Sequence, residues 1–475
     1  MTETAVRGGE CDLLVRGGLV TAAHGTGVMD VAITGGLISG VGSGPWTARR
    51  TIDATNLVVL PGGVDAHTHL NSNWPFEDER RPADDFESGT RAALAGGITT
   101  ICDFTYTLGA ESLGEAIVRV QASAAARSHA DFALHVAVTT LAGDVAAQVP
   151  EVIAAGFPSF KFYTQLEDYA CRGADYLDLL EVIGACGGIA MFHCEDRALL
   201  QYGAAALRRS GRMPPRHYPA AKPSEVETAA TAQALCYAAA AGVPAYIVHL
   251  SAGPALDQVL AARTRGARVY AETRPLYLHL TADCFDADDA DAALFIGTPP
   301  LRDQADRNRL WTALGSGEID TVGSDHVGFT RAQKYQPGDT FETVPKGMAN
   351  MATMIPMLYS EGVLKNRLTM EQLVAVVAEN PARIFGLYPR KGAIAVGADA
   401  DLCILDPALT RPVSARAAHS AADFDVFEGW QVTGWPVQTV LRGQVAYADG
   451  KVAAKPGSGR LVKGIAAGTA QMTGR

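Results

Sequence analysis

The chain has 475 residues, a formal net charge of −11, 48% hydrophobic residues and 19% charged residues. This composition is typical of a well-packed soluble enzyme and excludes an intrinsically disordered chain. The acidic balance argues against nucleic acid and against anionic membrane surfaces as partners. No apolar run is long enough to span a membrane, and the N-terminus lacks the hydrophobic core of a signal peptide, so we expect a cytoplasmic protein.

The two ends of the chain share a pattern of short strands joined by glycine turns. It occurs over residues 11–60, as in DLLVRGGLVTA and DVAITGGLISGVG, and returns over 391–452, as in VQTVLRGQVAYADGKV. We therefore expect residues 1–60 and 386–455 to meet as one small composite β-sandwich. The remaining segment, 456–475, predicts either a tail that contacts another subunit or a frayed end.

Between these ends, short apolar runs alternate with alanine-rich stretches that carry apolar residues at helical spacing. Eight such units predict a (β/α)₈ TIM barrel, in the α/β class, over residues 61–385. One of the helices is predicted to begin with a capping box formed by Ser224 and Glu227 and to end at Gly242. The eight predicted strands lie within residues 57–70, 97–105, 132–138, 159–164, 189–196, 245–251, 267–273 and 320–328.

Polar residues recur at the C-terminal ends of the predicted strands, where barrel enzymes build their sites. They are His67, His69, Lys161, His193, His249 and Asp325. The first two are spaced i and i+2 on one strand, so both side chains point into the barrel. A single histidine near a strand end is more often a hydrogen-bonded core residue. Recurrence on five strands at equivalent depth instead predicts one shared site.

Four imidazoles and one carboxylate suit a metal with nitrogen and oxygen ligands, such as zinc. Six candidate ligands are too many for one tetrahedral ion and enough for two divalent ions. A pair of cations needs anionic ligands, and Asp325 is the one obvious carboxylate. Lys161 supplies another if burial lowers its pKa and the neutral amine adds CO₂ to form a bridging carbamate. The alternative is a buried stem whose ammonium reaches water.

Several motifs together resemble the amidohydrolase superfamily, and within it the dihydropyrimidinase and hydantoinase branch. They include PGGVDAHTHL, SFKFY, FHCED, YIVHLS, TPPLR and GSDH, and the resemblance extends over residues 11–452. It implies a barrel with a composite β-sandwich and a two-metal site with a carboxylated lysine. It also implies hydrolysis of a small cyclic amide or imide by a homo-oligomer, a tetramer or a dimer.

The resemblance also assigns roles to the six strand-end residues. The implied ligands of the more buried metal are His67, His69 and Asp325. Those of the more exposed metal are His193 and His249, and Lys161 is the implied bridge between the two. The implied mechanism is attack by a metal-bridging hydroxide on the ring carbonyl. In it, the catalytic Asp325 carries the proton of the hydroxide to the departing nitrogen.

The chain departs from this family where substrate would bind. Leu166 stands where hydantoinases usually have a tyrosine that helps to hold the oxyanion, and Tyr163 and Tyr169 are nearby candidates to replace it. Thr298 and Lys346 replace a serine and an asparagine. In the family, those two positions bind the substrate amide mainly through backbone atoms.

Two further departures bear on the choice of substrate. Arg274 stands where cysteine is common, and Asn71 stands where dihydroorotases usually have an arginine, which counts against a dihydroorotase. Arg274 and Lys346 predict a substrate unlike plain dihydrouracil, with a larger apolar part, a carboxylate or both. The alternative is that both cations point away from the pocket and pair with surface acids.

Two other functions stay open from the sequence. One is an allantoinase or another ureide or imide hydrolase of the same superfamily. The other is a non-catalytic scaffold relative, which the complete set of ligand candidates opposes.

Overall fold

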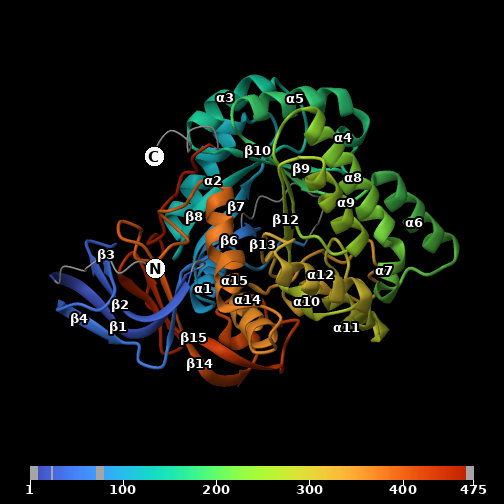
Figure 1. Ribbon diagram of the computed structural model, residues 1–475. Helices are drawn as coiled ribbons and strands as arrows, with labels where there is room; N and C mark the ends of the chain where they lie inside the picture. The colour runs from blue at the N-terminus through green and yellow to red at the C-terminus, as the bar shows by residue number, and fades with distance from the viewer. Residues whose placement is uncertain (1–8, 23–24, 71–79, 467–475) are drawn as a thin grey trace.

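The computed structural model describes residues 9–22, 25–70 and 80–466 (Figure 1). Its centre is a parallel sheet in which eight strands follow one another in chain order around a barrel. A bridge between Thr68 and His326 joins the first strand to the segment after the last. The strands confirm all eight predicted positions: β6 Gly63–Thr68, β7 Ile98–Thr105, β8 Asp131–Ala137, β9 Ser159–Tyr163, β10 Ile189–His193, β11 Ala245–Ile247, β12 Val269–Thr273 and β13 Thr321–Val322.

Helices surround the barrel on its outer side (Figure 1). The larger ones are α1 Phe86–Ala95, α2 Leu113–Arg127, α3 Val145–Ala154, α5 Gly173–Ala185, α6 Arg197–Arg209, α8 Ser224–Ala240, α9 Gly253–Thr264 and α12 Gln304–Ser316. Shorter ones are α4 Glu167–Cys171, α7 Tyr218–Ala221, α10 Pro275–His279, α11 Asp289–Leu294, α13 Arg331–Lys334, α14 Met354–Met357, α15 Met370–Val374 and α16 Asn380–Ile384. Among the described residues, no helix combines the length and the apolarity that a membrane span needs.

The predicted capping box of α8 is wrong. Pro223 is the N-cap residue and Ser224 is the first residue of the helix, with no side-chain cap. The Glu227 side chain instead turns inward, where it accepts hydrogen bonds from Ser251 and Arg302. The Glu227 carboxylate therefore forms a buried ion pair with Arg302 and does not cap the helix.

The strand β9 shows how the sequence sets the two faces of the barrel wall. Its side chains alternate, as in any strand. Phe160 and Phe162 belong to the apolar layer between strands and helices. Lys161 and Tyr163 take the opposite, inward positions and line the cavity inside the barrel mouth. The lysine in this aromatic run is therefore fixed inside the barrel by strand geometry.

The two ends of the chain form one nine-stranded mixed sheet beside the barrel. Its strands are β1 Glu10–Ala22, β2 Gly25–Thr34, β3 Leu37–Val41, β4 Thr47–Asp53, β5 Val58–Pro61, β14 Leu402–Pro412, β15 Gln431–Leu441, β16 Gln444–Ala448 and β17 Lys451–Val452. β5 lies between β1 and β14 and so joins the N-terminal and C-terminal parts.

The stretch 57–70, predicted as one strand, is two strands in different sheets. The chain passes from β5 to β6 at Gly62, where a Cβ atom would collide with the side chain of Thr99. A glycine is needed there because the backbone approaches the next strand so closely.

After β17, the chain returns across the N-terminal end of β8. Val462 donates a backbone hydrogen bond to Phe132 at 2.7 Å, and Phe132 donates one to Arg460 at 3.0 Å. The described part of the predicted tail, residues 456–466, is therefore bound to the barrel of its own chain. A contact with another subunit stays a prediction, and residues 467–475 lie outside the described residues.

A buried charge cluster fastens the composite sheet to this end of the barrel. The Lys391 ammonium lies 2.6 Å from Asp131 on β8, 2.6 Å from Asp401 and 3.0 Å from Asp399. Arg442, in the turn after β15, also pairs with Asp131. Burial opposes the charge on Lys391, but the three carboxylates outweigh it and raise the pKa of this lysine.

We predict that Lys391→Met lowers the free energy of unfolding by about 3–5 kcal/mol, because it leaves buried carboxylates without their cation. The measurement is the urea midpoint of unfolding. Arg49→Met is the matched control, since the pair of Arg49 with Asp12 is exposed and its loss should cost less than about 1 kcal/mol. Equal shifts in the two variants would contradict the prediction.

Candidate active site

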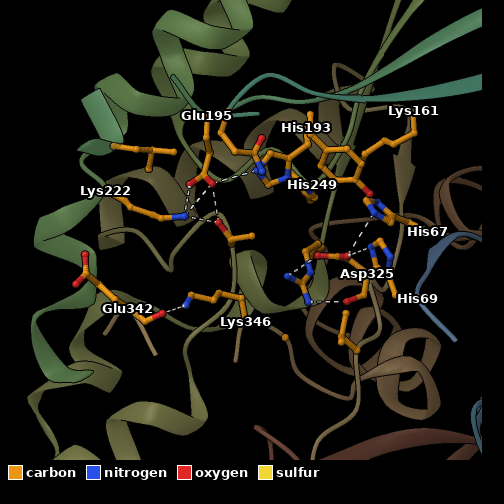
Figure 2. A pocket seen from close by; sticks show the side chains of 17 residues that line it. His67, His69, Lys161, His193, Glu195, Lys222, His249, Asp325, Glu342 and Lys346 are labelled. Atoms are coloured by element: carbon orange, nitrogen blue, oxygen red, sulfur yellow. Dashed lines mark hydrogen bonds and ion pairs between the residues drawn. The ribbon is translucent and has the colours of Figure 1, made fainter. Parts of the chain in front are cut away.

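A cavity of about 320 Å³ opens at the C-terminal ends of the barrel strands (Figure 2). All six strand-end residues singled out from the sequence line it: His67, His69, Lys161, His193, His249 and Asp325. The side chains of each are nearly or fully buried. The structure therefore brings together residues that are up to 258 positions apart in the chain (325 − 67).

His67, His69 and Asp325 form one group at the floor of the cavity. Asp325 Oδ1 lies 3.0 Å from His69 Nε2 and 3.3 Å from His67 Nε2. One ligand-type atom from each of the three residues lies within 4.8 Å of the others. Two imidazoles and one carboxylate at this spacing are able to hold a divalent metal ion.

His193 and His249 form a second group next to the first. His193 Nδ1 and His249 Nε2 are 2.8 Å apart, and the His249 ring stacks on His67 with centroids separated by 5.4 Å. The four imidazoles thus form one continuous cluster. His249 and Asp325 both have positive φ, 40° and 46°, a conformation that is uncommon outside glycine and is concentrated at functional sites.

Glu272, on β12, orients the first group. Its Oε1 lies 2.7 Å from His67 Nδ1 and accepts the backbone N–H of His249 at 3.0 Å. Oε2 accepts the Tyr246 hydroxyl at 2.8 Å. Burial raises the pKa of Glu272 to about 7. By holding Nδ1, this carboxyl group directs Nε2 of His67 toward Asp325.

Glu195 orients the second group and links it to the cavity wall. Its Oε2 lies 3.1 Å from His193 Nε2, which leaves Nδ1 to face His249. The same oxygen accepts the Thr298 hydroxyl at 2.7 Å and the Lys222 ammonium at 2.8 Å. Burial alone would raise the pKa of Glu195, but Lys222 and His193 hold it well below its ordinary value.

Lys161 has an unusual environment for a buried lysine. It is 0% exposed, which overturns the alternative that its ammonium reaches water. Nζ has no hydrogen-bond partner in the described structure. Two other lysines in that structure are equally buried, but Lys334 donates to three carbonyls and Lys391 binds three carboxylates. Burial lowers the pKa of Lys161 to about 8, so a neutral amine is accessible near neutral pH.

Arg274 lines the cavity and does not pair with a surface acid. It is fully buried, and Nη1 lies 2.9 Å from Asp325 Oδ2. Nε and Nη2 donate to the backbone carbonyls of Ser324 and Asp325, both at 3.1 Å. Arg274 therefore holds the left-handed turn at Asp325 and one of its carboxylate oxygens. The alternative that this cation points away from the pocket is wrong.

The other residues predicted at the substrate site are placed as follows. Tyr163, Thr298 and Lys346 line the cavity, and Lys346 Nζ donates to the backbone carbonyl of Glu342 at 2.5 Å. Leu166 is not among the lining residues and packs, partly buried, against the apolar cluster inside the barrel. Asn71 lies outside the described residues.

Sequence reasoning missed three residues that organise the site. Glu195 is two positions after His193, which places it on the same side of the chain, and this spacing was a usable signal. Glu272 is the one acidic residue in the apolar run ARVYAET, which was a weaker signal. Lys222 lies in a loop, more than 25 positions from each of its two partners, Glu195 and Thr298. No local sequence pattern indicates its role.

Comparison with known proteins agrees with this geometry. Residues 58–156 and 229–446 match the amidohydrolase family. The D-hydantoinase of Geobacillus stearothermophilus is 36% identical over 455 residues, which cover 95% of this chain and 96% of the relative.

Two solved structures extend the likeness to the whole fold. The D-hydantoinase from Bacillus sp. AR9 superposes with a TM-score of 0.91 at 34% identity, covering 96% of this chain and 99% of that one. The dihydropyrimidinase from Brevibacillus agri NCHU1002 gives a TM-score of 0.90 at 32% identity, covering 95% and 98%. Because the likeness includes both the barrel and the composite sheet, the chain belongs to the amidohydrolase family.

Proposed function

We propose that this protein hydrolyses a C–N bond of a small cyclic amide or imide, of the hydantoin or dihydropyrimidine kind, with two divalent metal ions. The observation that carries the proposal is the cluster of four imidazoles, one carboxylate and one unpartnered lysine at the floor of the cavity. The names of the similar proteins, D-hydantoinase and dihydropyrimidinase, support this reaction class.

The donor set fits a pair of divalent ions. His67 Nε2 is buried without a hydrogen-bond partner in the described structure, although it faces Asp325. His193 Nδ1 and His249 Nε2 face each other at 2.8 Å, so both nitrogens are directed toward the same part of the cavity. We propose zinc, because imidazole and carboxylate ligands suit it. When bound, the ions would lower the pKa of a coordinated water and polarise the ring carbonyl.

We propose that Lys161 is carboxylated and lies between the two ligand groups. An amine without any acceptor is unfavourable in a buried site, whereas a carbamate would provide two oxygens for two cations. The lowered pKa of Lys161 supports this proposal, because only the neutral amine adds CO₂.

We propose that Asp325 acts as the general base and then as the general acid. Arg274 and the two histidines hold the pKa of Asp325 well below its ordinary value, against the effect of burial. The carboxylate is therefore ionised at neutral pH. It would take a proton from the attacking water and donate it to the ring nitrogen as the C–N bond breaks.

The wall of the cavity supports a neutral ring as substrate. Arg274 is paired with Asp325, and Lys222 is paired with Glu195. These two cations therefore do not favour a carboxylate on the substrate. The hydroxyl of Thr298 is bonded to the same ion pair, so we propose that the backbone around it binds the ring amide. From the family likeness and the composition, we also propose a cytoplasmic homotetramer or homodimer.

The proposed reaction predicts that the zinc-loaded protein hydrolyses ring compounds from a panel of hydantoins, dihydrouracil, cyclic imides and allantoin. The measurement is the loss of the ring absorbance. Asp325→Asn keeps the shape of the ligand but cannot accept a proton, so turnover should fall by at least about 100-fold. Metal analysis is the control, because the variant should still retain some zinc. Normal turnover by Asp325→Asn with metal bound would refute the role of this carboxylate, and turnover of allantoin alone would favour an allantoinase.

Carboxylation of Lys161 predicts that Lys161→Ala binds fewer than two zinc ions per chain and loses most activity. Added acetate or propionate should restore part of both, since a short carboxylate fits the space that the side chain leaves. A carbon-13 carbamate signal after growth in labelled bicarbonate is the independent readout. Two bound ions and full turnover in Lys161→Ala without added acid would rule out the bridge.

The position of Glu272 predicts that Glu272→Ala weakens zinc binding by about 10- to 100-fold, because His67 loses the group that orients it. Glu272→Gln retains an oxygen acceptor for His67 Nδ1 and should keep most of the affinity. Chelator competition measures both affinities. Glu342→Gln, at the rim of the cavity, is the control and should bind zinc like the wild type. The prediction fails if the alanine variant does so too.

A further inference from the structure

The cavity wall contains a glutamine whose side-chain oxygen has no hydrogen-bond donor in the described structure. We propose that the amide of this residue, Gln165, selects the substituent on the substrate ring, and that the favoured substituent is a neutral carboxamide on a short arm. The proposal rests on the proposed function. It adds a specificity-determining residue and names the kind of substrate that this residue favours.

The unpaired oxygen of Gln165 differs from the other unpaired atoms of the cavity. Oε1 is buried, and leaving a buried acceptor unpaired is costly, so most such atoms in native proteins have a partner. The other buried lining atoms without a partner in the described structure belong to the ligand cluster: His67 Nε2, Lys161 Nζ and His249 Nδ1. In the proposed function, metal ions or the carbamate satisfy those three residues. The oxygen of Gln165 is left for the substrate.

The position of Gln165 places its amide nearer the mouth than the ligand cluster. It comes two positions after the end of β9, and the C-terminal ends of barrel strands face the mouth. Thr164 donates its backbone N–H to the carbonyl of His193, and Arg197 Nη1 donates to the backbone carbonyl of Gln165 at 3.2 Å. Four residues of chain extend at most about 14 Å. A short substituent on a ring whose carbonyl lies near Lys161 is therefore within reach of this amide.

The charges on the outer wall favour a neutral substituent. Glu342 and Lys346 both line the cavity, and Figure 2 shows them on the side away from Lys161. Glu342 pairs with Arg208 at 2.6 Å, and Lys346 donates to the backbone carbonyl of Glu342. A carboxylate cannot donate to the Gln165 oxygen and is repelled by Glu342, whereas an ammonium is repelled by Lys346. The carboxylate predicted from the sequence is therefore disfavoured.

A carboxamide is the neutral group that complements a glutamine. The glutamine amide has an oxygen acceptor and an NH₂ group with two donors, so a second amide is able to donate to the oxygen and accept from the nitrogen. An alkyl substituent would leave the Gln165 oxygen unpaired, and a site that binds a substrate by hydrogen bonds rejects an analogue that lacks them. The cavity of about 320 Å³ is at the lower end of the range for drug-sized ligands, which limits the arm to a short one. The alternative is that Oε1 binds only water, in which case it does not distinguish substituents.

The test compares three rings that differ only in the substituent, with the zinc-loaded protein. They are a hydantoin with a carboxamidomethyl group, its isobutyl analogue of nearly the same shape, and its carboxymethyl analogue. The same three groups are placed on dihydrouracil if the wild type opens no hydantoin. We expect kcat/KM of the wild type to be about 10- to 100-fold higher for the carboxamide than for either analogue. Most of the difference should be in KM, because the substituent lies away from the bond that breaks.

Gln165→Leu has nearly the size of the natural side chain but offers no hydrogen bond. It should lower kcat/KM for the carboxamide by about 10- to 100-fold and leave the isobutyl compound within a few-fold of wild type. Zinc content should be unchanged, and the thermal midpoint should not fall, because Oε1 has no bond within the described structure to lose. Gln201→Leu is the matched control, since Gln201 is exposed on α6 and is not among the lining residues. It should keep the wild-type preference.

Equal kcat/KM for the three rings in the wild type, or a preference for either analogue, would overturn the proposal. So would an unchanged preference in Gln165→Leu. A loss of activity on all three rings together with a lower thermal midpoint in that variant would show a structural role for the amide and would also overturn it. A wild-type protein that holds zinc but opens none of the rings would overturn the proposed function, and this inference with it.

Discussion

The site depends on one constraint, the burial of the Lys161 side chain inside a closed barrel. Strand alternation places this lysine inward because Phe160 and Phe162 occupy the outward positions under the helices. An amine in that place has either to find acceptors or to lose its charge. The two other buried lysines have acceptors: Lys334 donates to backbone carbonyls and Lys391 to carboxylates, and both have structural roles. At Lys161, burial lowers the pKa and so favours the neutral amine, although Asp325 and Glu272 act in the opposite direction.

The groups around the cluster fix the orientation of its side chains. Glu272 turns one imidazole, Glu195 turns another, and Arg274 holds the carboxylate of Asp325 in a left-handed turn. Each of these groups is buried and multiply bonded, so its geometry is fixed before any ligand arrives. Such pre-organisation is what allows a site to stabilise a transition state without reorganising at the moment of reaction. It also explains why Arg274 and Lys222 line the cavity although each is paired with a carboxylate.

Much of the fold and the gathering of the six strand-end residues in one cavity could be predicted from the sequence, because the relevant signals are local. Strand runs, the i, i+2 spacing of His67 and His69, and polar strand ends are all visible within a few residues. The split of one predicted strand at Gly62 was not visible, because it depends on how closely Thr99 approaches. The ion pair between Lys222 and Glu195 was not visible either, because it joins two residues that lie far apart within the long connection between β10 and β11. A local capping pattern at Glu227 failed because a buried arginine competes for the same carboxylate.

The same alternation that buries Lys161 bears on how substitutions near an active site are read. Leu166 looks like the loss of a phenol when positions are compared along the sequence alone. In three dimensions, Leu166 is the N-cap residue before the short helix α4, whereas Tyr163 is still in the strand and shares the inward face of the lysine. A functional group is defined by the face and depth at which it enters the cavity, so a comparison of sequence positions alone does not decide which side chains line it.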